Sequence, residues 1–258
     1  MVVVIEKAKF SRGLHPGTRV SSGATRIGGC VVMENFAKES LCAELLAQVN
    51  DYRCRNTVPV IERRNEELPL KYSVIDGDRI ANDLPDVLNV YERVTRVVKE
   101  LWSGEFEPLA DRKVACNINI TQPGGSYRYH YDRNAVTAIL YLNATRGGET
   151  ECYPNYRLSL APAAHSTLQQ KLDRVLQNRF VRSVAATQLL VRPRPGRLLI
   201  MQGNRCLHSV RPVLESADRI NIVMSYDRPH ARFDVDANLN RYLYSAAETY
   251  VGDPNYLP

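Results

Sequence analysis

The triplet His130-Tyr-Asp132 constrains this chain more than any other feature, because it lies in Tyr127–Arg133, a stretch that favours a β-strand. Side chains alternate between the faces of a strand, so His130 and Asp132 are expected to point the same way. An imidazole beside a carboxylate supplies two ligands of a 2-His-1-carboxylate triad, which holds non-heme Fe(II) and leaves positions open. The third ligand has to come from a distant strand, and His208 is the best candidate.

A two-residue period starts at Val114, where Asn117, Asn119 and Thr121 alternate with isoleucines. Such a polar face belongs either to a solvent-exposed edge or to the lining of a barrel-like interior, and the sequence leaves both interpretations open. Turn-forming residues at 122–125 and 146–148 separate the strands that follow.

Arg219 begins a second alternating strand and shares its predicted face with Asn221. A cation on an otherwise buried strand is costly unless it is paired. Arg219 therefore either forms a structural salt bridge or holds the carboxylate of a ligand, which a guanidinium does with two parallel charge-assisted hydrogen bonds.

These elements occur in an order that resembles the Fe(II)/2-oxoglutarate-dependent dioxygenases, and most closely their prolyl-hydroxylase-like branch. The resemblance covers roughly residues 114–228. It rests on six segments, which are His130-Tyr-Asp132, Tyr141-Leu-Asn143, Gly147-Gly-Glu-Thr150, Pro195–Ile200, His208–Pro212 and Arg219.

The resemblance implies that Fe(II) is held by His130, Asp132 and His208. It also implies that 2-oxoglutarate is a cosubstrate whose distal carboxylate contacts Arg219 and Tyr141, and that O₂ is consumed with release of succinate and CO₂. Asn221, which shares the predicted face of Arg219, is also expected to bind the cosubstrate. Four further residues are expected to contact the substrate: Arg128, Asn119, Gln122 and Tyr127.

The expected architecture is α+β, with a double-stranded β-helix (jelly-roll or cupin-like) core and supporting N-terminal helices. We expect a single catalytic domain over 1–258. Its predicted parts are an N-terminal strand and helical support (1–113), the core (114–228) with an insertion (155–187), and a C-terminal extension (229–258).

Helical spacing predicts three helices. One is capped near Asn35 and buries Leu41, Leu45 and Val49. The second holds Pro85 in its first turn. The stripe expected to be buried along this second helix consists of Leu88, Tyr91, Thr95, Val98 and Trp102.

The third predicted helix, 166–180, lies inside the insertion. Its apolar positions at helical spacing are Leu168, Leu172, Val175, Leu176 and Phe180. It is either a plain surface helix or a lid over the substrate pocket, and we favour the lid because insertions at barrel mouths often serve binding.

Composition limits the partners. The net charge is +6 with a pI near 9.0, but the basic residues are spread along the chain without interleaved aromatics, which argues against nucleic acid. The apolar run at 2–5 is too short for a secretory signal and no membrane span follows, so a cytoplasmic location is expected. Six scattered cysteines without a CxxC pair are expected to be reduced thiols.

Three functional classes are compatible with the sequence. A hydroxylase acting on a small molecule (a free amino acid, peptide or natural-product intermediate) is favoured. A protein hydroxylase acting on prolyl or another residue is the alternative, and a non-enzymatic binding barrel is disfavoured by the intact ligand set. The sequence is compatible with a homodimer and does not name the substrate.

Overall fold

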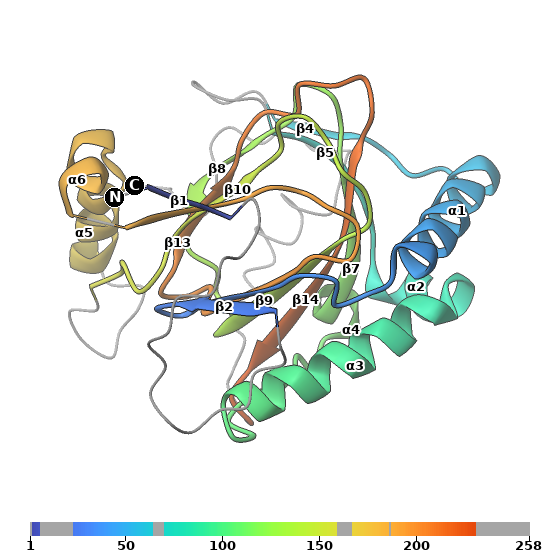
Figure 1. The fold of residues 1–258 in the computed structure, drawn as a ribbon, viewed down its shortest axis with the longest axis horizontal. Helices are drawn as coiled ribbons and strands as arrows, with labels where there is room; N and C mark the ends of the chain where they lie inside the picture. Colours follow the sequence, from blue (N-terminus) through green and yellow to red (C-terminus); the bar gives the residue numbers. More distant parts are fainter. Residues whose placement is uncertain (1, 6–22, 64–69, 159–166, 186, 231–258) are drawn as a thin grey trace.

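The computed structural model describes residues 2–5, 23–63, 70–158, 167–185 and 187–230 (Figure 1). Residues 1, 6–22 and 64–69 of the predicted N-terminal strand and helical support (1–113) lie outside these residues. The same holds for the insertion's residues 159–166 and for all of the C-terminal extension beyond 230.

The larger of two sheets has the strand order β2-β3-β12-β9-β14-β7-β5-β4, and β6 pairs with β14 at one end. Its strands are β2 (Ala24–Ile27), β3 (Cys30–Met33), β4 (Ile61–Arg63), β5 (Leu70–Ile75), β6 (Glu107–Pro108), β7 (Cys116–Thr121), β9 (Val136–Tyr141), β12 (Leu198–Met201) and β14 (Arg219–Asp227).

The smaller sheet has the order β1-β11-β10-β13-β8, and all its pairs are antiparallel except β1 with β11. Its strands are β1 (Val2–Ile5), β8 (Tyr127–His130), β10 (Thr150–Tyr153), β11 (Gln188–Val191) and β13 (Leu207–Val210). Buried residues of both sheets pack together in one apolar cluster, so the sheets face each other across a common interior. This arrangement is the predicted double-stranded β-helix.

The register of the larger sheet separates an apolar face from a polar one. Ile222 lies beside Leu140 and Ile118 on the outer face, whereas Asn221 lies beside Tyr141 and Asn119 on the inner face. Because β7 runs between β14 and β5, its polar side chains are internal. The interpretation of this polar face as a solvent-exposed edge is therefore wrong.

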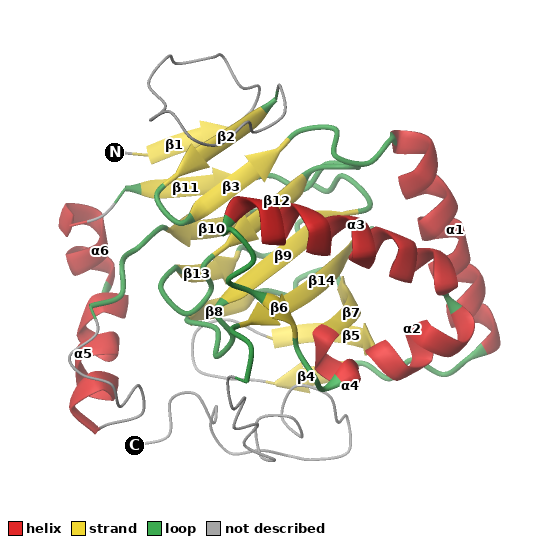
Figure 2. Cartoon of the chain, turned by 90° about the horizontal axis from the view of Figure 1, so that it is seen from below, coloured by secondary structure: helices red, strands yellow, loops and turns green. Residues whose placement is uncertain are grey.

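Four helices lie on one side of the molecule, and α3 runs across the larger sheet (Figures 1 and 2). They are α1 (Glu39–Arg55), α2 (Gly77–Asp83), α3 (Pro85–Leu101) and α4 (Arg112–Ala115). None of the helices in the described part of the chain is long and apolar enough to cross a membrane.

The first two predicted helices exist, but with shifted details. Helix α1 starts at Glu39 instead of near Asn35, whose φ of 53° places it in a turn. Pro85 does open α3. The residues that α3 buries most deeply are valines one position away from most of the predicted stripe, and they are Val87, Val90, Val94 and Val98. The predicted Leu88 and Tyr91 lie at the margin of this stripe, partly buried.

The insertion forms α5 (Thr167–Gln177) and α6 (Arg179–Ala185) on the opposite side of the molecule (Figure 1). Their buried side chains, among them Leu176, pack against Tyr129 and Tyr153. These tyrosines alternate with His130 and Cys152 along their strands, so they project from the outer face of the smaller sheet. The described part of the insertion is therefore a surface element rather than the expected lid.

Three apolar residues of the predicted insertion stripe, Leu168, Val175 and Phe180, are exposed. Helical spacing identified the helix but not the face that it buries. Polar contacts help to fix the helix instead. Asp173 forms an ion pair with Arg157, with 2.6 Å between the closest nitrogen and oxygen.

We expect Ile222→Ala to lower the free energy of unfolding by about 2–5 kcal/mol, because this fully buried side chain packs between sheet and helices. Leu168→Ala, at an exposed site on α5, should change it by less than about 0.5 kcal/mol. Urea denaturation of both variants tests this. Equal losses would contradict the placement of the core.

Candidate functional site

Two histidines and one aspartate converge at the interior face of the smaller sheet. His130 ends β8 and lies opposite His208 of β13 in the antiparallel register. One carboxylate oxygen of Asp132, Oδ1, lies 3.5 Å from His130 Nε2 and 3.4 Å from His208 Nε2. The three ligand atoms all lie within 4.8 Å of one another, so they could hold a metal ion.

Asp132 reaches this position in a different way from the one expected. Strand β8 ends at His130, and Asp132 follows two residues later in an extended loop. Its backbone N–H donates to the Gly203 carbonyl oxygen at 3.0 Å. A backbone contact with a distant turn, rather than strand alternation, therefore directs the carboxylate toward the histidines.

The histidines are oriented by their own strands. His130 Nδ1 lies 2.8 Å from the Arg128 carbonyl oxygen, and His208 Nδ1 lies 3.0 Å from that of Cys206. A carbonyl oxygen can only accept, so each Nδ1 carries the proton in the neutral ring. Both Nε2 atoms, which face Asp132, are then left with lone pairs available to a metal.

Thr137 and Gly203 complete the surroundings of Asp132. The Thr137 hydroxyl donates to Oδ2 at 2.5 Å, which leaves Oδ1 directed at the histidines. A Cβ on Gly203 would lie 2.3 Å from Oδ2, so a side chain there would displace the carboxylate. Sequence reasoning missed both residues, because Thr137 looks like an ordinary strand residue and Gly203 like an ordinary turn residue.

The charges of the three side chains depend on one another. Burial opposes ionisation of Asp132, but the two histidines hold its pKa well below the usual range. Burial alone would lower the pKa of His208, whereas the Asp132 carboxylate raises it to about 9. Without a metal, His208 is thus protonated at neutral pH, and a metal that binds Nε2 has to displace that proton.

A second polar group, centred on Arg219, lies on the inner face of the larger sheet. Arg219 is almost completely buried and donates to Asn221 Oδ1 and, at 3.0 Å, to Thr150 Oγ1. Tyr141 lies beside it, with its ring centroid 5.2 Å from the guanidinium carbon and its hydroxyl 2.6 Å from Thr150 Oγ1. A Cβ on Gly148 would lie 2.8 Å from Arg219 Cδ, which explains a glycine there.

Arg219 has no carboxylate within ion-pairing distance among the described residues, and its buried Nε lacks a hydrogen-bond partner. The interpretation as a structural salt bridge therefore fails for this part of the chain. A buried guanidinium held only by neutral groups retains unused donors. It is suited to bind an anion that enters the interior.

Of the four residues expected to contact the substrate, Asn119 and Tyr127 are hydrogen-bonded to each other. Asn119 Nδ2 donates to the Tyr127 hydroxyl at 2.6 Å, and Thr121 donates to Asn119 Oδ1 at 3.1 Å. Arg128 is half-buried and lies in β8, two residues before His130. Gln122 is not brought to this surface, because its side chain donates to Ser73, which is paired with the outward-facing Ile120.

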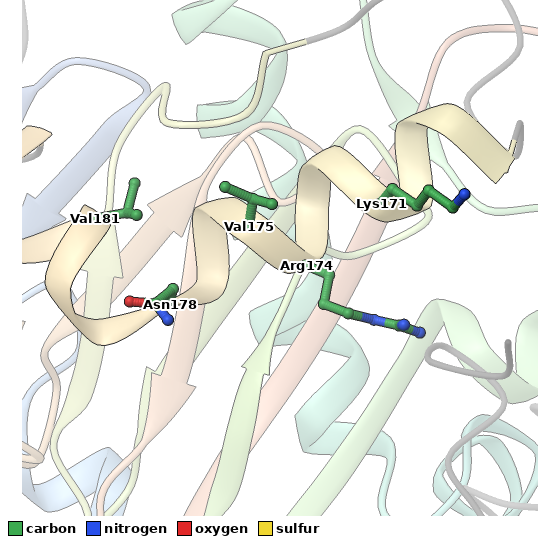
Figure 3. A pocket seen from close by; sticks show the side chains of 5 residues that line it. All are labelled: Lys171, Arg174, Val175, Asn178 and Val181. Atoms are coloured by element: carbon green, nitrogen blue, oxygen red, sulfur yellow. The ribbon is translucent and has the colours of Figure 1, made fainter.

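A shallow surface hollow lies on α5, α6 and the residue between them (Figure 3). It is lined by Lys171, Arg174, Val175, Asn178 and Val181. Since these helices cover the outer face of the smaller sheet, the hollow is separated from the two histidines by that sheet. It does not belong to the candidate site.

Comparison with known families matches residues 116–226 to the 2OG-Fe(II) oxygenase superfamily. A comparison with curated protein sequences found no match.

Three similar solved structures illustrate the fold. The epimerase SnoN from nogalamycin biosynthesis is 15% identical, with a TM-score of 0.59 over 78% of this chain and 79% of that one. The carbocyclase SnoK from the same biosynthesis is 14% identical, with a TM-score of 0.60 over 83% and 86%. A Pseudomonas putida prolyl-4-hydroxylase is 18% identical, with a TM-score of 0.52 over 78% and 94%.

A double-stranded β-helix with two histidines and an aspartate converging inside it defines the class of non-heme iron oxygenases. The matched segment contains both histidines, the aspartate and Arg219, so the chain is similar to the 2OG-Fe(II) oxygenase superfamily over the residues that build the candidate site. Enzymes of this superfamily use Fe(II), 2-oxoglutarate and O₂.

We expect Thr137→Val to weaken Fe(II) binding about tenfold or more, because the substitution removes the hydroxyl that holds Asp132 Oδ2. Anaerobic calorimetric titration measures this. Thr95→Val removes a hydroxyl that donates to the Tyr91 carbonyl oxygen on α3, so it should leave the affinity unchanged. Equal affinities for the Thr137→Val variant and the original protein would show that this contact does not position the carboxylate.

Proposed function

We propose that His130, Asp132 and His208 bind Fe(II), and that the enzyme hydroxylates an unactivated C–H bond of a small molecule with release of succinate and CO₂. Bound Fe(II) with 2-oxoglutarate supplies the activation of O₂, and the protein supplies position and environment. A protein hydroxylase acting on prolyl or another residue is the second candidate.

The buried Arg219 is the observation that carries this proposal. A guanidinium with unused donors, no acidic partner among the described residues and a place on the interior surface fits the distal carboxylate of 2-oxoglutarate. Thr150 links it to the smaller sheet, which carries the histidines. The same interior therefore offers a site for a divalent metal and a site for a dicarboxylate.

Each residue around Arg219 has a distinct task. Asn221 and Thr150 hold the guanidinium plane, and Tyr141 lies beside it with a hydroxyl that also contacts Thr150. Burial raises the pKa of Tyr141, so this hydroxyl keeps its proton and can donate to a carboxylate. Such fixed donors orient the cosubstrate without needing to reorganise.

Two observations bear on the substrate. SnoN and SnoK, which belong to nogalamycin biosynthesis, superpose on this chain with TM-scores of 0.59 and 0.60. Prolyl hydroxylases from Pseudomonas putida and Trichoplax adhaerens give 0.52 and 0.51, the latter solved with a peptide. The first pair supports a small molecule, and Asn119 with Tyr127 provides polar groups to orient one. The insertion helices support neither candidate, since they lie outside the interior.

Arg219→Lys should raise the KM for 2-oxoglutarate, because lysine keeps the charge but loses the planar pair of donors. The loss of a hydrogen bond to a charged group, about 1.5–3 kcal/mol, corresponds to roughly 10–100-fold. Arg197→Lys is the matched control, since Arg197 is equally buried but ion-paired to Glu34 at 2.8 Å. It should lower stability and leave this KM unchanged. A similar rise in both variants would refute the role of Arg219.

Succinate formation tests the iron site and the substrate class together. Free amino acids, short peptides and natural-product intermediates are supplied with Fe(II) and 2-oxoglutarate, and substrate-dependent succinate is measured. Asp132→Ala should abolish it because a metal ligand is lost, whereas Asp173→Ala, on the outer insertion helix, should retain it. Full turnover in Asp132→Ala would remove Asp132 from its proposed role. Stimulation by a folded or unfolded protein substrate, with none by free amino acids, short peptides or natural-product intermediates, would favour the second candidate.

A further inference from the structure

A second group of ligand atoms, made only of sulfur, lies in the same interior. Cys30 opens β3, Cys152 lies in β10, and Cys206 directly precedes β13. Their Sγ atoms all lie within 4.8 Å of one another, and those of Cys30 and Cys206 are 3.7 Å apart. Three segments that are far apart in the sequence thus place three thiols at one point.

The surroundings of these thiols are apolar apart from one further sulfur. The cluster belongs to the buried core between the sheets, with Val32, Leu189 and Val191 among its neighbours. Met201 Sδ lies 4.0 Å from Cys152 Sγ. All three cysteines are fully buried, whereas Cys42 and Cys116 belong to the separate core under the helices.

The spacing and the donor type both suit a soft metal ion. Two sulfur ligands at about 2.3 Å from a metal, at trigonal or tetrahedral angles, lie about 4 Å apart. Thiolate and thioether donors select Cu(I), whereas zinc is bound by thiolate, imidazole and carboxylate. A thioether beside three thiols therefore favours Cu(I) over Zn²⁺.

The cysteines would bind the ion as thiolates, which are the form of cysteine that ligates metals. Their protons would be released as the metal binds.

We propose that Cys30, Cys152 and Cys206 form a binding site for Cu(I), with the Met201 thioether as a weaker fourth donor. The site is distinct from the His130/Asp132/His208 group and does not depend on the oxygenase function. It adjoins that group, however. Cys152 is paired with His208 across the strands, and the Cys206 carbonyl oxygen orients the His208 ring. Because the thiols are fully buried, the ion is expected to enter while the chain folds.

The test uses the full chain produced in copper-supplemented medium and purified without oxygen. After dialysis against the Cu(I) chelator bicinchoninate, elemental analysis should find about one copper per chain in the original protein. Cys152→Ala should reduce this to background. Cys116→Ala replaces a buried cysteine outside the cluster and should retain the copper.

X-ray absorption at the copper edge on the original protein keeps the proposal testable if the cysteine variants fail to fold. A first shell of sulfur alone supports the site. Nitrogen or oxygen ligands would place the copper at the histidines and overturn the proposal. Copper at background in the original protein, or unchanged in Cys152→Ala, would overturn it as well.

Discussion

The antiparallel pairing of β8 with β13 is the constraint on which the site depends, because it sets His130 opposite His208. A slip of one residue would turn His208 to the outer face and bring Leu207 inside. The tyrosines that alternate with the histidines oppose such a slip, since Tyr129 and Tyr153 are packed under α5 and α6. Arg182 strengthens this contact, with its guanidinium carbon 3.6 Å from the Tyr129 ring centroid. The insertion helices therefore support the site from the outer face of the smaller sheet, because they help to fix the register of the strands that carry the histidines.

The sequence allowed prediction of which side chains meet, although Asp132 reaches the histidines from a loop and not through strand alternation. His208 was predicted to face the His130/Asp132 pair, and it does. The supports of these side chains could not be predicted, because Thr137 and Gly203 act through contacts between segments that are far apart in the chain. Amphipathic spacing likewise located the first helix of the insertion, but it predicted one helix over 166–180 where the structure has α5 and a separate α6. Spacing could not identify the buried face of these helices. The surface they pack against consists of tyrosines that project outward from two separate strands, β8 and β10.

The sequence predicted that Arg219 is buried, and the structure shows which residues surround its guanidinium. Strand alternation placed the Arg219 side chain on the same face as Asn221, and the sequence left two partners for it, an acidic residue of the protein or the carboxylate of a ligand. Only the fold shows that Asn221 and Thr150, both neutral, are its partners among the described residues. Neutral partners fix the guanidinium without neutralising it, so its charge stays available to an anion. A carboxylate partner would have fixed the guanidinium in the same place, but it would have neutralised the charge that an anion needs.

The interior thus contains two donor sets of opposite chemical character. Nitrogen and oxygen ligands occupy one, and sulfur atoms occupy the other, with His208 and Cys152 as cross-strand neighbours at the boundary. Fe(II) accepts imidazole and carboxylate, whereas Cu(I) prefers sulfur, so ligand type separates the two ions although the sites adjoin. The apolar cluster around the thiols adjoins His208 through its cross-strand neighbour Cys152, and a low local dielectric there strengthens the interaction of His208 with Asp132. The same side chains that adjoin the histidine therefore create the conditions for a second, softer metal site.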